Sequence, residues 1–205
     1  MADGLSVKDL PALGWPGIEG GESALLRRCV VGDEAAFAEL VESHERMVYQ
    51  LAFHLLGDHN EALDLSQDVF LRVFRTLSGF RGQSSLRTWI FRIVVNQARN
   101  RQRWWRRRHR AAQVSIDDHQ RSNGELPSPS HTSAPDRLLR QKEVAQRLWQ
   151  ALDELPFDQK TAIILREIDG LSYEEIAYSL DVAVGTVKSR LARAREALRS
   201  QLRDI

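Results

Sequence analysis

The chain has 205 residues, of which 42% are hydrophobic and 28% charged, and its formal net charge at pH 7 is +1. This composition fits a globular protein of one large or two small domains, and the single cysteine, Cys29, excludes an internal disulfide framework and favours a buried structural thiol. No apolar run approaches the roughly 20 residues of a membrane span, and the N-terminus lacks the segments of a signal peptide, so we expect a cytoplasmic protein without membrane insertion.

The first part of the chain divides into a leader and a helical domain. Residues 1–21 are rich in glycine and contain two prolines, which predicts a disordered leader to which we assign no role. From Glu22 to about Arg107, apolar residues recur at helical spacing, with breaks near Gly57 and at residues 78–83. This pattern predicts an all-helical N-terminal domain over residues 22–112.

The helix that precedes the second break has an apolar side and an acidic side. Its inner face is marked by apolar residues at helical spacing, namely Leu65, Val69, Val73 and Leu77. Four polar residues can project outward: Asp64, Gln67, Asp68 and Arg72. Because an acidic patch repels DNA, we interpret this side as a contact for a basic protein surface, with ordinary solvation as the alternative.

The helix expected over about residues 85–107 has a core side and a basic, aromatic side. The core side comprises Leu86, Ile90, Ile93, Val94 and Gln97. The opposite stripe comprises Thr88, Trp89, Arg92, Asn96, Arg99 and Arg103. Arginine can neutralise a nucleic-acid backbone, asparagine can bond a base edge and tryptophan can stack on an unpaired base, so the stripe indicates single-stranded nucleic acid. The preceding loop, with Phe80, Arg81 and Ser84, could wrap an extruded base; for Trp89, filling a gap in the core is the alternative.

Charge is concentrated at the end of this helix. Residues 99–110, RNRQRWWRRRHR, carry seven arginines and no acid, although the whole chain is almost neutral. Such a run is an electrostatic footprint for a polyanion. The two tryptophans and the arginines around them could grip duplex DNA beside a melted segment.

A linker and a second domain follow. Between about Ser115 and Pro135 the chain loses apolar periodicity and collects Ser, Asn, Asp and Pro, which predicts a flexible linker over residues 113–135. Helical periodicity resumes at Asp136, and Pro156 interrupts it. The predicted fold class is therefore all-α, with two small helical domains joined by a flexible linker and the second domain over residues 136–205.

The stretch LSYEEIAYSLDVAVGTVKSRLARAR, which begins at Leu171, predicts a helix-turn-helix. Ser172 and Glu175 are spaced as a capping box for a helix that begins at about Tyr173. The corner falls at Asp181, where glycine is usual but aspartate tolerates the left-handed conformation.

The second helix of this motif presents a small, polar and cationic face. Its inward stripe comprises Val187, Leu191, Ala194, Leu198 and Leu202. Nearly opposite lie Ser189, Ala192 and Arg193, flanked by Lys188 and Arg190. This face suits the major groove, because arginine can fork onto guanine and lysine or serine can bind phosphates. A solvated, arginine-rich surface helix is the alternative.

Three separated segments of the chain resemble the signature segments of an extracytoplasmic-function (ECF, group 4) sigma factor of bacterial RNA polymerase, in the sigma-70 family: DLSQDVFLRVF, FRGQSSLRTWIFRIVVNQARN and LREIDGLSYEEIAYSLDVAVGTVKSRLARAREAL. The resemblance covers nearly the whole chain after about Glu22. It implies an alternative sigma factor that binds core RNA polymerase and directs promoter-specific initiation, and that is neither an enzyme nor dependent on a cofactor.

The resemblance also implies which residues meet which partner. The N-terminal domain would be region 2, and its acidic helix would dock on the clamp coiled coil of the polymerase through Asp64, Leu65, Gln67, Asp68, Phe70 and Arg72. Its loop and basic helix would melt the minus-ten element and capture a flipped base with Phe80, Arg81, Ser84, Thr88, Trp89, Arg92, Asn96, Arg99 and Arg103. The C-terminal domain would be region 4, which packs on the polymerase flap and reads the minus-thirty-five duplex with Thr186, Lys188, Ser189, Arg190 and Arg193. An anti-sigma factor is a further expected partner.

The sequence departs from the family's pattern at three positions. Leu63 stands where an acidic residue is frequent, and Ala183 replaces a common proline before the second helix of the helix-turn-helix. Ala192 occupies an outward position that is often bulkier, which leaves the minus-thirty-five preference open.

Two alternative functions are compatible with parts of the sequence. A stand-alone helix-turn-helix regulator would bind promoter duplex without polymerase. A helical hydrolase would use His54 and His59 with Asp58 or Asp64, but no pairing among these residues has the context of a metal site or a catalytic triad.

Overall fold

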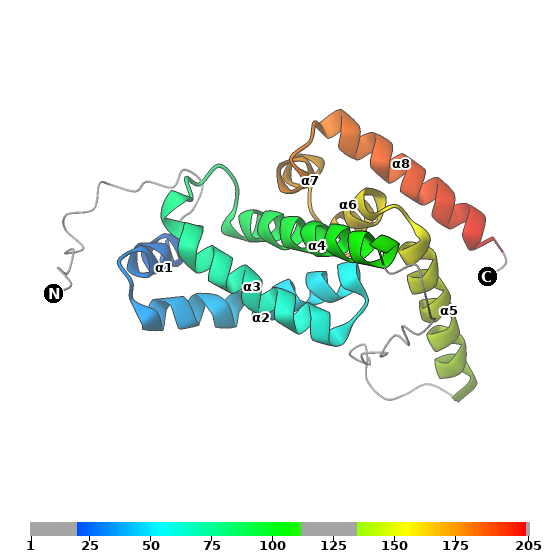
Figure 1. Cartoon of the computed structure of the whole chain (residues 1–205), viewed down its shortest axis with the longest axis horizontal. Helices are drawn as coiled ribbons and strands as arrows, with labels where there is room; N and C mark the ends of the chain where they lie inside the picture. Colours follow the sequence, from blue (N-terminus) through cyan, green and yellow to red (C-terminus); the bar gives the residue numbers. More distant parts are fainter. Residues whose placement is uncertain (1–19, 112–134, 204–205) are drawn as a thin grey trace. The chain divides into compact units, whose positions relative to one another are not determined.

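The computed structural model describes residues 20–111 and 135–203, and all regular structure in these ranges is helical. The described residues form two compact units (Figure 1). The first contains α1 (Gly21–Val30), α2 (Glu34–Leu56), α3 (His59–Thr76), the short 3-10 helix η1 (Leu77–Gly79) and α4 (Leu86–Ala111). The second contains α5 (Pro135–Glu154), α6 (Phe157–Glu167), α7 (Tyr173–Leu180) and α8 (Val184–Gln201).

The predicted all-α fold class is therefore confirmed. The predicted leader, except for its last two residues, and the predicted linker, except for its last residue, lie outside the described residues. None of the described helices combines the length and the apolar character needed to cross a bilayer.

The core of the first unit lies where α2, α3 and α4 pack against one another. Each helix contributes fully buried apolar side chains, among them Leu51 from α2, Val69 from α3 and Phe91 from α4. Helix α1 packs on α2 and adds Leu26 and Cys29 to the buried set. The bundle leaves one side of α3 and one side of α4 free to carry polar groups.

At two junctions of this unit, a glycine follows the end of one helix and an aspartate caps the start of the next. Gly57 ends α2 with φ 75°, at the break that the sequence predicts, and the Asp58 side chain caps α3 by accepting the backbone N–H of Glu61 at 2.8 Å. A second break, at Gly32 with φ 87°, is not predicted by the periodicity. There the Asp33 side chain caps α2 by accepting the N–H of Ala36 at 3.0 Å.

The second unit is built around α6, which packs against both α7 and α8, while α5 contacts α8. Pro156 separates α5 from α6, as predicted. Across this junction the buried Lys160 Nζ donates to Asp153 Oδ1 at 2.7 Å, so that this buried charge is paired with an opposite one.

Candidate nucleic-acid interface

The helix-turn-helix is formed as the sequence predicts. Ser172 Oγ accepts the backbone N–H of Glu175 at 3.1 Å, and Glu175 Oε2 accepts that of Ser172 at 2.8 Å, so the capping box at the start of α7 is complete. At the corner, Asp181 has φ 56° and ψ 51°, in the left-handed region. It is the only non-glycine residue with positive φ in the ranges that the structure describes. These caps set the orientation of α8 relative to α7.

Helix α8 has the two faces that its periodicity predicts. Val187, Leu191 and Ala194 are buried against the rest of the unit. Lys188, Ser189, Ala192 and Arg193 are exposed and form its outward face. The outward face is therefore short, polar and cationic at Lys188 and Arg193, which suits contacts to a duplex.

The structure corrects the expectation for Arg190. Its Nη2 donates to Asp158 Oδ2 at 2.9 Å, and its side chain is only 20% exposed. Asp158 lies in the first turn of α6, 32 residues earlier in the chain, so periodicity within α8 could not reveal the pair. Thr186 is half-buried, and its carbonyl accepts the Ser189 hydroxyl at 2.9 Å.

On α4 the predicted core side is buried at Leu86, Ile90 and Val94. Along the predicted stripe, Asn96 and Arg103 are exposed, while Trp89, Arg92 and Arg99 are half-buried. The stripe therefore presents an amide and several guanidinium groups along one helix.

Thr88 does not belong to the exposed stripe, because its side chain is 1% exposed. The Ser85 hydroxyl and the Thr88 hydroxyl lie 2.8 Å apart, and the Thr88 N–H donates to Ser85 Oγ at 3.1 Å. Thr88 thus belongs to the cap at the start of α4 rather than to a binding surface.

The loop before α4 also differs from the expectation. Phe80 is 3% exposed, and its ring lies 5.1 Å from that of Trp89 in a tilted arrangement. The ring of Phe80 is therefore not open to solvent, and its predicted contact with an extruded base stays a prediction. Arg81 remains exposed, and the Ser84 hydroxyl donates to the Ser85 carbonyl at 3.1 Å.

On α3 the polar residues of the predicted docking side are exposed: Asp64, Gln67, Asp68 and Arg72. Leu65 and Phe70, assigned to the same side by the resemblance, are buried. Leu65 lies one turn before Val69 on the inner face, so it packs in the core.

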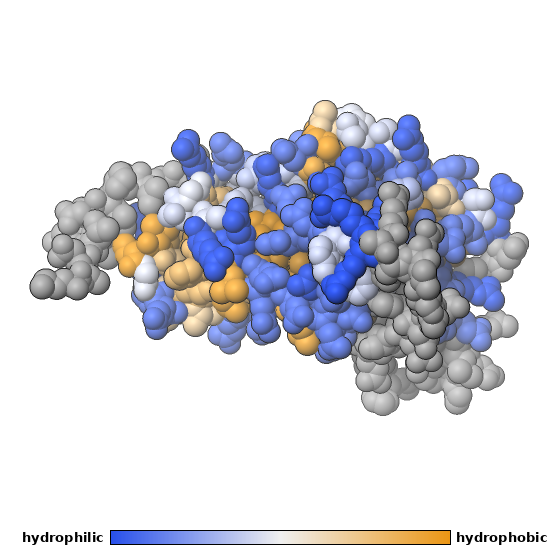
Figure 2. Space-filling model, viewed as in Figure 1, coloured by the Kyte–Doolittle hydropathy of each residue, from blue (hydrophilic) through white to orange (hydrophobic). Residues whose placement is uncertain are grey.

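An exposed apolar patch on α3 was missed by the sequence analysis. Leu71 is 54% exposed and Phe74 57% exposed, and the ring of Phe74 meets that of Phe37 from α2 edge to face at 5.1 Å. Figure 2 shows hydrophobic residues gathered where the start of α2 and the end of α3 meet. The sequence does carry a signal for this patch, because Leu71 and Phe74 are apolar but fall outside the inner-face spacing of Val69 and Val73.

Arg101 was missed as well, and it ties α4 to α3. Its Nη1 donates to the carbonyl of Glu61 at 3.0 Å and to Glu61 Oε2 at 2.7 Å, and its Nη2 donates to Asp68 Oδ2 at 3.1 Å. One guanidinium thus joins the basic helix to the acidic one.

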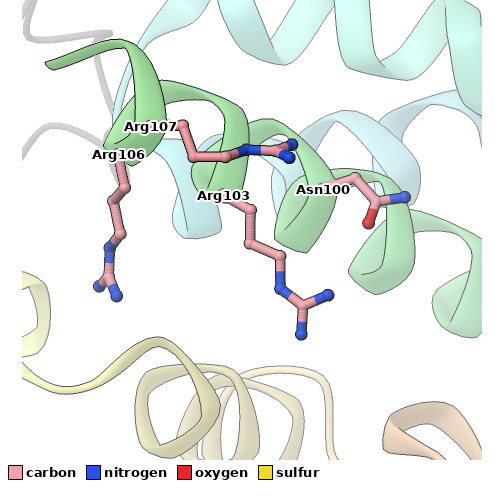
Figure 3. Close-up of a pocket in the computed structure, with 4 residues that line it drawn as sticks. All are labelled: Asn100, Arg103, Arg106 and Arg107. Carbon is pink, nitrogen blue, oxygen red and sulfur yellow. The ribbon is translucent and has the colours of Figure 1, made fainter. Parts of the chain in front are cut away.

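The basic end of α4 forms a shallow concave surface lined by Asn100, Arg103, Arg106 and Arg107. Figure 3 shows that the guanidinium groups of Arg103 and Arg106 extend away from the helix on one side. Next to this surface, the Arg108 guanidinium lies 4.6 Å from the ring centroid of Trp104, whose side chain is exposed. Cations and an aromatic face together are typical of nucleic-acid contacts.

The residues considered for a hydrolase have structural contacts. Asp58 caps α3, and His59 Nδ1 lies 2.8 Å from the Tyr49 hydroxyl. Within residues 20–111 and 135–203, no group of three His, Cys, Asp or Glu side chains is arranged to hold a metal ion.

The fold and these surfaces define the class first: a helical protein with a helix-turn-helix in one unit and a basic, aromatic helix in the other. Comparisons with known proteins then identify the family. Residues 40–111 match the model for Sigma-70 region 2, and residues 145–198 match that for Sigma-70, region 4.

Curated relatives agree with these matches. The RNA polymerase sigma-H factor of Pseudomonas aeruginosa is 35% identical over 184 residues, which cover 90% of this chain and 95% of the relative. The ECF RNA polymerase sigma-E factor of Escherichia coli is 36% identical over 186 residues, with the same coverage of 90% and 95%.

Solved structures agree too. The sigma factor RpoE of Bartonella quintana, in complex with the anti-sigma factor NepR, matches with a TM-score of 0.62 and 28% identity over 82% of this chain and 97% of its own. CnrH, in complex with the cytosolic domain of CnrY, has a TM-score of 0.61 at 24% identity, covers 88% of this chain and 96% of its own, and supports the fold.

The chain belongs to the sigma-70 family, within its ECF group. It is an alternative sigma factor, which binds core RNA polymerase and promoter DNA and directs promoter-specific transcription. The relatives are sigma factors, which are not enzymes, and nothing in the comparisons supports a stand-alone regulator.

Proposed function

We propose that the two units divide promoter recognition, with region 2 over residues 22–112 and region 4 over residues 136–205. In region 4, Lys188, Ser189 and Arg193 contact the minus-thirty-five duplex from the outward face of α8. The assignment rests on the exposure of these three side chains on the second helix of a helix-turn-helix whose first helix begins with a complete capping box.

In region 2, the stripe on α4 holds the melted minus-ten element. The exposed amide of Asn96 is suited to a base edge, and Arg92, Arg99 and Arg103 are suited to the backbone of a single strand. Trp89, supported from below by Phe80, offers an aromatic face to an unpaired base. Unstacking a base costs a few kcal/mol, and such contacts can offset that cost.

Helix α3 provides the contact to the polymerase clamp. Asp64, Gln67 and Asp68 make this surface acidic, and the exposed Leu71 and Phe74 give it an apolar end. An acidic surface repels DNA, whereas an apolar patch rimmed by charges is typical of a protein contact. Region 4 packs on the polymerase flap.

We further propose that the chain itself catalyses nothing, needs no cofactor, and acts in the cytoplasm under the control of an anti-sigma factor. The sigma factor RpoE of Bartonella quintana, which matches this fold, was solved in complex with an anti-sigma factor. An anti-sigma factor that covered α3 or α8 would block a contact that initiation needs.

Run-off transcription from a genomic library, with core RNA polymerase and the full chain, tests the proposal. We expect discrete start sites that are absent with core alone, and their upstream sequences give the promoter preference. Duplex footprinting by the chain without polymerase, together with no start sites when core is added, would overturn the proposal and favour a stand-alone regulator.

Asn96→Ala tests the assignment of the stripe. We expect open-complex formation to fall about tenfold, since a lost base-edge contact is worth at least about 1 kcal/mol. Permanganate reactivity of the melted strand measures this, and co-purification with core checks that polymerase binding is intact. Asn60→Ala, at an exposed position of α3, is the matched control. Equal melting by both variants would refute the role of Asn96.

A further inference from the structure

Two ion pairs join α8 to α6, and they differ in how far the arginine is exposed to solvent. Arg190 Nη2 lies 2.9 Å from Asp158 Oδ2, and Arg195 Nη2 lies 2.7 Å from Glu167 Oε1. The Arg190 side chain is 20% exposed, whereas that of Arg195 is 46% exposed. The Nη1 atom of Arg190 is buried without a hydrogen-bond partner. Arg190 is thus withheld from solvent, and Arg195 is not.

The two arginines also point in different directions around α8. At about 100° per residue, Arg190 lies only about 60° from the exposed Arg193, next to the proposed DNA face. Arg195 lies about 160° from Arg193 by the same measure, on the far side of the helix. A change at Asp158 can therefore bring a cation to DNA, and the same change at Glu167 cannot.

We propose that Asp158 is a specificity-determining residue that holds Arg190 off the sugar–phosphate backbone. This inference rests on the proposed role of α8. Phosphate contacts add affinity without sequence information, so a freed Arg190 would strengthen binding to all duplexes alike. The Asp158 carboxylate, 42% exposed, adds repulsion toward nearby phosphates. Because Asp158 keeps Arg190 in an ion pair, discrimination between DNA sequences depends on Lys188, Ser189 and Arg193.

Stability alone does not account for this arrangement. Ion pairs near the surface contribute little to stability, because solvent screens them and side-chain entropy opposes them. The pair also leaves Arg190 Nη1 buried without a hydrogen-bond partner, which destabilises the folded state. The effect of the pair on DNA binding is therefore the property to measure.

The test compares Asp158→Asn with the parent, using the full chain and a random-sequence duplex labelled for fluorescence anisotropy, at salt concentrations from roughly 50 to 200 mM. We expect the variant to bind the random duplex more tightly. We also expect the slope of log K against log salt to become more negative by about 0.9, the value for one additional phosphate contact. Glu167→Gln is the matched control, because it removes the same charge from the other ion pair and should leave the slope unchanged.

Two further variants separate the effect of Arg190 from a general loss of negative charge. Asp158→Asn combined with Arg190→Gln should lose the additional slope, and Asp158→Glu, which keeps the carboxylate, should retain the parental slope. An unchanged slope in Asp158→Asn, or an equal change in Glu167→Gln, overturns the proposal.

Arg190→Gln keeps the proposal testable if Asp158→Asn fails to fold, as judged by circular dichroism. This variant should match the parent in slope, because Arg190 does not touch DNA in the parent. A slope weaker by about 0.9 would mean that Arg190 already binds a phosphate, which overturns the proposal. Since the assay contains neither polymerase nor promoter, its failure is distinguishable from failure of the run-off experiment.

Discussion

The exposure and chemical state of individual side chains in this protein depend on contacts that helical periodicity does not predict. Cys29, in the last turn of α1, is an example, since it is buried and free of any disulfide. Burial raises the pKa of its thiol above the ordinary value of 9.0. At neutral pH the group is therefore the unreactive thiol rather than the nucleophilic thiolate.

We expect iodoacetamide to alkylate Cys29 at least about tenfold more slowly in the native chain than in the chain unfolded by urea. The raised pKa shifts the onset of native reactivity to higher pH than in the unfolded chain, so the ratio of rates should stay large through neutral pH. Mass spectrometry of timed samples measures both rates. Similar rates in the two states would contradict burial of the thiol.

At this scale, periodicity finds which side chains point outward but not what they meet. It correctly predicts that Asn96, Lys188 and Arg193 are exposed. Periodicity does not reveal the Asp158 carboxylate that holds Arg190, and the composition of the loop does not reveal the Trp89 ring against which Phe80 lies. Such pairings depend on tertiary packing, which no single helical pattern encodes.

At the scale of elements, the corner between α7 and α8 is closed by backbone hydrogen bonds around Asp181. The N–H of Val182 donates to the Ala177 carbonyl at 3.0 Å, and that of Asp181 donates to Tyr178 at 3.3 Å. Both bonds require Asp181 to keep its left-handed conformation, which carries a steric cost for a residue with a Cβ atom.

We expect Asp181→Gly to be more stable than Asp181→Ala by about 1 kcal/mol, because both remove the side chain but only glycine adopts positive φ without cost. Urea unfolding followed by circular dichroism gives the two free energies of unfolding. An alanine variant as stable as the glycine variant would show that the corner relaxes away from the left-handed region.

Most element boundaries follow from local chemistry and could be predicted. The Gly57–Asp58 pair, Pro156 and the Ser172–Glu175 box each end or begin a helix at the predicted place. The division of α1 from α2 at Gly32 is not predicted by periodicity, because apolar residues continue on both sides of it, although Gly32 and Asp33 repeat the local signal of Gly57 and Asp58.

At the scale of the whole molecule, a net charge of +1 conceals a basic surface at the end of α4. Arg106, Arg107 and Arg108 are all exposed there, beside the exposed ring of Trp104. This surface follows the proposed minus-ten stripe along the same helix, so it is placed to meet the backbone of adjoining DNA.

We expect Arg106→Gln combined with Arg107→Gln to weaken binding of the full chain to random duplex. The slope of log K against log salt should become less negative by about 1.8, which corresponds to two lost phosphate contacts. Arg46→Gln combined with Arg75→Gln changes the net charge equally at exposed positions of α2 and α3 and should leave the slope nearly unaltered. Equal slopes for the two double variants would assign the effect to net charge alone.

Asp68 belongs to the acidic surface proposed to meet the polymerase, and it is also one of the two acids that hold Arg101. A cation of the polymerase that pairs with Asp68 would compete with Arg101 for this carboxylate, whereas the 2.7 Å bond from Arg101 to Glu61 does not involve it. If α3 meets the polymerase as proposed, docking at Asp68 would loosen one of the two acidic contacts of Arg101, and the bond to Glu61 would still tie α4 to α3.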